Sequence, residues 1–258
     1  MITVRGHDPV YVSTVRTASF GTDNWGKVNR FDQVLPGEPV GRGEPFEDTP
    51  LYRSFRQVFL EGERWENTRF FRNLMKLMDR QGHVYRCTSR EALLDRLENQ
   101  VGQIWHSMRR HGYRSQAAIL ESLWLRDAAS GDFRPFQGAG YHSAITTNHE
   151  IKIGLNEDGD LLFLDGRHRM AIARLLDVPE VPVNVIFRHH LWLERRARLL
   201  DLLGQPPADG AGLLEPDHPD LPPRAASPEA VRRAEAEFAA RGWPLPGFRP
   251  LPAASGLS

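Results

Sequence analysis

The sequence predicts an α+β fold in which a small mixed sheet is packed against helices. Three observations lead to this prediction. Apolar residues keep helical spacing throughout residues 89–111. Residues 151–155 and 161–164 have the pattern of two strands joined by a short turn. Directly after Asp165 the apolar period changes from that of a strand to that of a helix, so strands and helices alternate in the second half of the chain.

The first 83 residues are predicted to form an N-terminal extension that is irregular at first and then helical. Residues 1–48 are rich in Gly, Pro, Asp and Asn and contain only short β-like runs. Thr49-Pro50 predicts a helix start, because a capping side chain precedes Pro at the first helical position, and Gly62 predicts its end. A second helix is predicted from its apolar stripe: Phe70, Phe71, Leu74, Leu77 and Met78.

Arginines and aromatic residues are interleaved over residues 51–72, which is a pattern also found in nucleic-acid-binding proteins. The aromatic residues fall at helical spacing, however. We therefore expect them to form a core, with the arginines on the solvent-exposed face of the helices.

Residues 84–204 are predicted to be the central domain. Val84–Cys87 is expected to be a short strand, and the capping box Thr88–Glu91 opens the long helix that ends at Gly112. Residues 115–127 are predicted to be helical. After the strand pair, a helix is expected from Gly166 to about Asp177, then a strand over 181–187, in which Pro182 suits a strand start or an edge, and a helix over 191–203.

The last segment, residues 205–258, is predicted to be a Pro-rich linker, a short helix from Ser227 and a frayed tail. Cys87 is the only cysteine, so the chain cannot form an internal disulfide. The sequence shows neither a signal peptide nor an apolar run of membrane-spanning length, which favours a cytoplasmic protein without a membrane partner.

The composition also bears on nucleic-acid binding. Lys+Arg and Asp+Glu are both 33 in the 258 residues, so the formal net charge is zero. A dedicated nucleic-acid-binding protein usually has a strong basic excess. DNA is therefore disfavoured as the main partner, although a local basic patch is compatible with this balance.

The turn Asp165-Gly166-Arg167-His168-Arg169 is the strongest functional signal. A helix that starts directly after a strand and a glycine has free N–H groups at its first turn, and these favour anions. Two arginines and a histidine in the same turn add positive charge. The turn therefore predicts phosphate binding. For Asp165 three roles are open: capping the helix, orienting Arg169, or holding a metal through water.

This part of the chain resembles the ParB/sulfiredoxin superfamily. The likeness covers roughly residues 84–190, where a long helix ends at Gly112 with Gln116 close behind, the Gly166-x-x-Arg169 turn follows, and a Val-Pro-Val strand comes next. Arg167 stands where sulfiredoxin has its catalytic cysteine, so sulfiredoxin chemistry is not expected. The Asp-Gly-x-His-Arg form is closer to the kinase-like and uncharacterised members of the superfamily.

The resemblance implies a nucleotide (ADP, ATP or CTP) with Mg²⁺, bound through Gly166, Arg167, His168, Arg169 and Gln116. It also implies phosphotransfer to a small-molecule hydroxyl, with Asp165, His168 and Glu150 as catalytic candidates. Glu150 has two readings: a general base toward the hydroxyl, or an exposed strand end.

Three functions stay open: this nucleotide-dependent activity, a non-catalytic DNA- or protein-binding module of ParB type, and a scaffold in which the turn serves stability alone. ParB proteins carry a helix-turn-helix motif after the nucleotide domain. The helices predicted within residues 191–258 are too few to form such a motif. No structural zinc is predicted, because the adjacent His189 and His190 would point to opposite faces of a strand.

Overall fold

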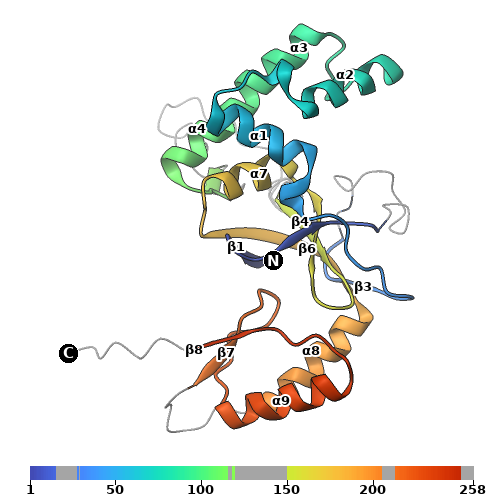
Figure 1. Ribbon diagram of the computed structural model, residues 1–258, viewed down its shortest axis with the longest axis vertical. Coiled ribbons are helices and arrows are strands. Elements are labelled where there is room, and N and C mark those ends of the chain that lie inside the picture. Colours follow the sequence, from blue (N-terminus) through green and yellow to red (C-terminus); the bar gives the residue numbers. More distant parts are fainter. Residues whose placement is uncertain (16–27, 29, 116–117, 120–149, 205–212, 251–258) are drawn as a thin grey trace, which may run out of the picture.

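The computed structural model describes residues 1–15, 28, 30–115, 118–119, 150–204 and 213–250. It confirms the predicted α+β class. Within the described residues, six strands form a mixed sheet of order β1-β6-β4-β5-β2, with β3 also paired to β6 (Figure 1). The strands are β1 (Ile2–Arg5), β2 (Val10–Val12), β3 (Gln33–Leu35), β4 (Ile151–Leu155), β5 (Leu161–Asp165) and β6 (Glu180–His189).

The predicted strand pair is the centre of the sheet. β4 and β5 form an antiparallel hairpin, and β4 also pairs in parallel with β6. Between them, the side chain of Asn156 accepts hydrogen bonds from the backbone N–H groups of Asp158 and Asp160, as a turn-forming Asn commonly does. The predicted order of strand, hairpin, strand, helix and strand over residues 150–187 is therefore confirmed.

The described part of residues 1–48 contains more regular structure than the sequence predicts. β1 pairs antiparallel with β6, β2 pairs in parallel with β5, and β3 pairs in parallel with β6. Val4 and Val10 are buried in the main core. The short β-like runs have too few residues to indicate strands by themselves, and they become strands because they pair with segments that are far away in the sequence.

Pro182 is the third residue of β6 and lies opposite Thr3 of β1. The ladder between β6 and β4 begins one residue later, at Val183. Pro182 therefore lies beside β1 only, which agrees with the predicted position near a strand start.

One face of the sheet is covered by helices, with α1, α4 and α7 close to it and α2 and α3 farther out (Figure 1). Thr49, Thr68 and Ser89 cap α1, α2 and α3 with their side chains. The predicted long helix is continuous from residue 90 to 111, but residues 96–101 are π-helical. The helices are α1 (Pro50–Glu61), α2 (Arg69–Gln81), α3 (Arg90–Asp95), α4 (Gly102–His111) and α7 (Arg167–Leu175).

The predicted strand at Val84–Cys87 is wrong. Val84 and Cys87 form an isolated bridge, and the residues between them, Tyr85 and Arg86, have φ angles of 49° and 63°. The segment is thus a tight turn that ends one residue before the helix-capping sequence begins. A run of only four residues fits either conformation, and the turn places Tyr85 against His168 of α7.

The C-terminal segment also departs from the prediction. α8 (His190–Leu203) and α9 (Pro228–Ala240) lie where the sequence predicts helices, but the segments on either side of α9 also form a two-stranded sheet of β7 (Leu214–Pro216) and β8 (Phe248–Pro250). The predicted linker and tail therefore pair with each other in part. The carboxylate of Asp220 ties this unit to the rest, because it accepts hydrogen bonds from Arg188 of β6 and from the indole N–H of Trp192.

Candidate functional site

The predicted phosphate-binding turn joins β5 to α7. Gly166 is the N-cap residue of α7 and has a φ of 90°, a left-handed conformation that favours glycine. A Cβ at this position would lie 3.0 Å from Cγ1 and 3.1 Å from Cα of Ile151. Glycine is therefore required here both by the backbone conformation and by the close approach of β4.

Asp165 does not cap the helix. Its Oδ1 accepts a hydrogen bond from the backbone N–H of Gly166, at 2.8 Å. Among the described residues no side chain caps α7. The first turn of α7 consequently lacks the side-chain acceptor that α1, α2 and α3 each have, which leaves its N–H groups available to an anion.

The three basic residues of the turn point in three different directions. Arg167 is exposed and lines a cavity, His168 packs among aromatic side chains, and Arg169 is paired with Glu150. The structure therefore does not gather them into one cationic patch. Each has to be considered with its own surroundings.

His168 lies in an aromatic cage. Its ring stacks on Phe55, with centroids 5.5 Å apart and the planes at 25°, and it meets the rings of Phe70 and Tyr85 edge to face. Its Nε2 is 3.4 Å from the hydroxyl of Tyr85. Burial, followed by the nearby cations Arg167, Arg96 and Arg169, lowers the pKa of His168 to about 3.

A neutral, caged imidazole cannot neutralise a phosphate. The contacts of His168 are those of a core residue, and they do not favour its predicted role as a phosphate ligand and catalytic residue. These ring contacts could not be predicted from the sequence, because Phe55 and Tyr85 come from segments about 80 to 110 residues earlier in the chain.

Arg169 belongs to a polar cluster with Glu150 and Tyr113. Nη1 of Arg169 is 3.4 Å from Oε2 of Glu150, and the Tyr113 hydroxyl donates a 2.9 Å hydrogen bond to the same oxygen. Tyr113 follows α4 directly, and Glu150 precedes β4 directly. The segment that follows α4 therefore lies beside the turn at Tyr113.

The protonation of Tyr113 follows from its position. Burial raises its pKa, Arg169 opposes the rise, and Glu150 adds to it. The phenol therefore stays protonated at neutral pH and acts as a donor to Glu150.

Glu150 is only 4% exposed, which excludes the alternative that it is an exposed strand end. Its Oε2 is engaged by both the Arg169 guanidinium and the Tyr113 hydroxyl. This arrangement suits a residue that positions Arg169 beside Gly166 better than it suits a base that receives a proton from a substrate. Gln116 and His149 lie outside the described residues.

Sequence reasoning did not single out Lys152, which is fully buried in β4 directly opposite Asp165. Its Nζ donates a 3.0 Å hydrogen bond to the carbonyl of Val28. Burial lowers the pKa of Lys152, against the effect of Asp165. The alternation Ile151-Lys152-Ile153 indicates that Lys152 faces away from the main core, but not that a second apolar cluster covers this other face of the sheet.

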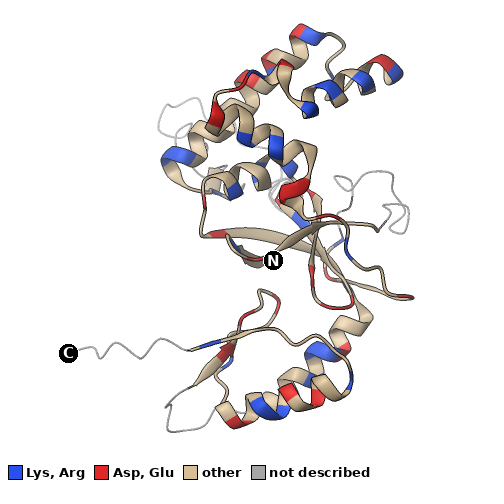
Figure 2. Ribbon diagram, in the orientation of Figure 1, with Lys and Arg blue, Asp and Glu red and all other residues tan. Residues whose placement is uncertain are grey.

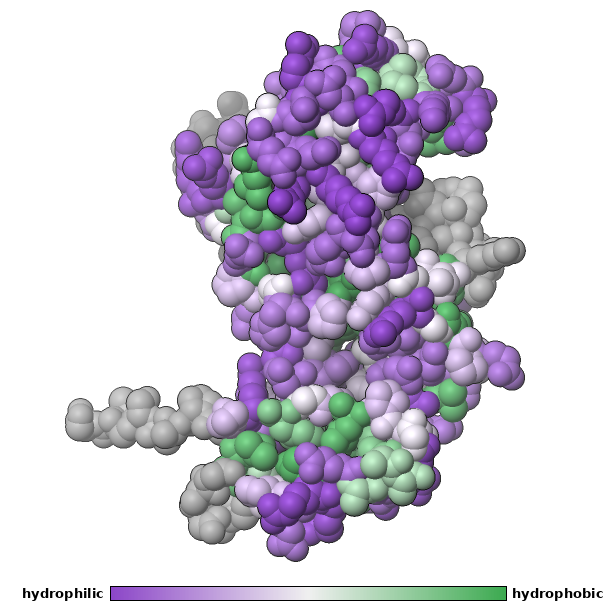
Figure 3. Space-filling model, in the orientation of Figure 1, coloured by the Kyte–Doolittle hydropathy of each residue, from purple (hydrophilic) through white to green (hydrophobic). Residues whose placement is uncertain are grey.

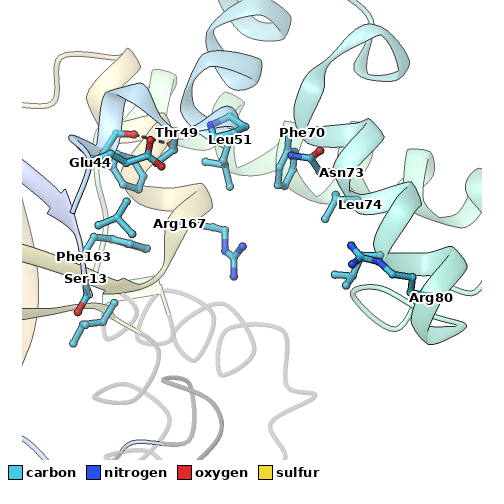
Figure 4. Close-up of a pocket in the computed structure, with 15 residues that line it drawn as sticks. Ser13, Glu44, Thr49, Leu51, Phe70, Asn73, Leu74, Arg80, Phe163 and Arg167 are labelled. Carbon is cyan, nitrogen blue, oxygen red and sulfur yellow. Dashed lines mark hydrogen bonds between the residues drawn. The ribbon is translucent and has the colours of Figure 1, made fainter. Parts of the chain in front are cut away.

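Arg167 lines a cavity of about 630 Å³ between the sheet and the helices α1 and α2. In Figure 4 its side chain extends into the space between Phe163 and Ser13 on one side and Arg80 and Asn73 of α2 on the other. Leu51, Phe70, Leu74 and Leu77 add to the apolar wall. A volume of this size, with mostly apolar walls and a few polar groups, is typical of sites for small organic ligands.

Two other sequence candidates lie away from this site. Cys87 is buried, and its Sγ is 3.6 Å from the carbonyl oxygen of Ala92. The rings of His189 and His190 are 4.7 Å apart rather than on opposite faces, because β6 ends at His189 and α8 begins at His190. Nδ1 of His189 accepts the N–H of Leu191, and its Nε2 lies 3.1 Å from the carbonyl of Glu38, so both nitrogens are in use.

Comparison with models of protein families, with curated protein sequences and with solved structures finds no match in any of the three. Among the described residues, no three His, Cys, Asp or Glu side chains are arranged so that they could hold a metal ion. In the same part of the chain, no helix combines the length and the apolarity of a membrane span.

Proposed function

We propose that this protein binds a nucleotide, with its phosphate groups at the first turn of α7 and at Arg167. The observation that carries the proposal is the position of Arg167. It is exposed, it is the first residue of a helix that no described side chain caps, and it lines a cavity of ligand size. Charge-assisted bonds from Arg and N–H groups at a helix start are the usual way in which proteins hold phosphate.

The remaining walls of the cavity suit the other parts of a nucleotide. Phe70 and Phe163 offer flat apolar surface for a base, and Arg80 offers a second cation at a distance from the helix start. ADP, ATP and CTP with Mg²⁺ are the ligands that the resemblance to the ParB/sulfiredoxin superfamily implies. Arg167 and the N–H groups at the start of α7 are donors that suit the phosphate groups of such a ligand. In this proposal Mg²⁺ would be held largely by phosphate oxygens and water.

Phosphotransfer to a small-molecule hydroxyl stays a prediction that rests on the resemblance. In that reaction the hydroxyl oxygen would attack the terminal phosphorus, the bond to the nucleotide leaving group would break, and the hydroxyl proton would pass to a base. The described residues favour Arg169 as a group that stabilises charge, held by Glu150 and Tyr113. They do not favour Glu150 itself as that base, because two donors already use Oε2.

Calorimetry with ADP, ATP, CTP and GTP, each with Mg²⁺, tests the binding proposal. Arg167→Ala is expected to weaken binding by roughly ten- to a hundredfold, which corresponds to the loss of about 1.5–3 kcal/mol for one charge-assisted hydrogen bond. Arg232→Ala is the matched control, since Arg232 is also exposed but lies on α9. The proposal fails if the wild-type protein binds none of the nucleotides, or if Arg167→Ala binds them as tightly as the wild type.

A further inference from the structure

The exposed side of α2 carries a row of four cations: Arg69, Arg72, Lys76 and Arg80. Their spacings of three, four and four residues place them along one side of the helix. At 1.5 Å per residue the row is about 16 Å long. Figure 2 shows these basic positions along α2, and Figure 3 shows a strongly hydrophilic surface over the helices at this end of the molecule.

Among the described residues, these four cations have no carboxylate partner, unlike the arginines of the neighbouring helix α1. In the described residues no Asp or Glu lies within ion-pair distance of any of the four, whereas on α1 Arg53 pairs with Asp48 and Arg56 with Glu61. α2 contains a single carboxylate, that of Asp79. The contacts made by two of the cations are to backbone carbonyls: Arg72 to Asn67 and Arg80 to Lys76.

We infer that α2 binds the phosphate backbone of duplex nucleic acid. A row of unneutralised cations at regular spacing attracts a row of phosphates, and the release of condensed counterions supplies the free energy of binding. A protein partner is a poorer fit, because protein interfaces have an apolar centre and the exposed side of α2 consists of charged and amide side chains. Single strands are also a poorer fit, because their sites use aromatic side chains for stacking and both aromatic residues of α2 are buried.

This inference is compatible with the neutral net charge of the chain, because the excess of positive charge is local. It is also independent of the proposed nucleotide site. Arg80 borders the cavity, but Arg69, Arg72 and Lys76 do not line it. A change of these three residues therefore separates the two activities.

The test is fluorescence anisotropy with a labelled, mixed-sequence DNA duplex of about 20 base pairs at salt concentrations from about 50 to 200 mM. The variant Arg69→Gln/Arg72→Gln/Lys76→Gln is expected to bind at least tenfold more weakly at the lowest salt. The slope of log K against log salt should become shallower by about 0.9 for each lost phosphate contact. For the three substitutions together, the slope should therefore change by roughly two to three. Nucleotide affinity, measured by calorimetry, should not change.

The matched control is Arg232→Gln/Arg233→Gln/Arg241→Gln, on α9 and at its C-cap, where two of the three arginines have carboxylate partners. It removes the same charge and should bind the duplex like the wild type. Should the α2 triple variant unfold, Arg69→Gln/Lys76→Gln leaves the contact of Arg72 to Asn67 in place and should still weaken binding severalfold.

Several results would overturn the inference. They are the absence of wild-type binding at about 50 mM salt, equal loss of affinity in the α9 control, or tighter binding of a single strand of the same length. Binding of poly-glutamate with the same affinity and the same loss in the α2 variant would point to an acidic protein instead and would also refute it.

Discussion

Replacement of His168 by Phe should make the protein less sensitive to acid. In the unfolded chain an imidazole titrates near pH 6.5, whereas burial in the aromatic cage lowers the pKa of folded His168 to about 3. Because the folded pKa is the lower one, the unfolded state takes up the proton first as the pH falls. The stability present above pH 6.5 is therefore lost progressively between about pH 6.5 and pH 3.

The magnitude follows from the two pKa values. At about pH 5 the unfolded imidazole is almost fully protonated and the folded one is neutral, which costs about 2 kcal/mol relative to neutral pH. This is an upper value, because His168 keeps some contact with solvent. Phe carries no proton and has an aromatic ring that can stack on Phe55, so His168→Phe should remove this contribution while it keeps the packing.

Urea denaturation followed by tryptophan fluorescence, at about pH 7.5 and about pH 5, measures the effect. The wild-type protein should lose up to about 2 kcal/mol more free energy of unfolding between the two pH values than His168→Phe does. Burial lowers the pKa of His218 as well, but this histidine is present in both proteins and cancels in the comparison. Equal losses in the two proteins would refute the buried, neutral state of His168. If His168→Phe does not fold, His168→Gln gives the same comparison.

Three further predictions concern the turn, the C-terminal unit and the cysteine. Gly166→Ala should destabilise the protein by about 2–3 kcal/mol in denaturant titrations. Gly62→Ala is the control and should cost less, because Gly62 has a similar φ but a Cβ there would meet no described atom within 4 Å. Similar losses in the two variants would contradict the close approach of Ile151 to Gly166. Asp220→Ala should cost about 3 kcal/mol, because it removes the buried carboxylate partner of Arg188 and leaves only the exposed Asp32 to pair with this arginine; a loss below about 1 kcal/mol would show that the pair is dispensable. Cys87→Ser should leave nucleotide affinity unchanged in calorimetry, and a large loss in a folded variant would move the chemistry to Cys87.

The sequence predicts those features of the fold that depend on neighbours in the chain. The capping residue Thr49 and the glycine stop at Gly62 appear in the structure, and the helix predicted after Thr88 is capped one residue later, by Ser89, because a cap uses only the N–H groups of its own first turn. The change of period at Asp165 likewise marks the boundary between β5 and α7. These signals are local in origin, and so they can be found without knowledge of the tertiary structure.

Features that depend on distant pairing were not predictable in this way. β1 and β3 are only four and three residues long. They are strands because each of them pairs with the backbone of β6. The burial of Lys152 depends on the segment near Val28 that covers the second face of the sheet. For both, the deciding contact lies more than 100 residues away in the sequence, where a periodic pattern carries no information about it.

The basic turn shows that residue types alone do not predict the directions of neighbouring side chains. Consecutive residues of an α-helix are about 100° apart around the axis, so Arg167, His168 and Arg169 cannot all face one ligand. Arg167 extends into the cavity, His168 packs in the aromatic core, and Arg169 pairs with the carboxylate of Glu150. A phosphate at the first turn of α7 would therefore meet backbone N–H groups and one or two arginines, and never the full set of three cations. A nucleotide affinity that falls for Arg167→Ala and is unchanged for His168→Phe is the result that this geometry requires.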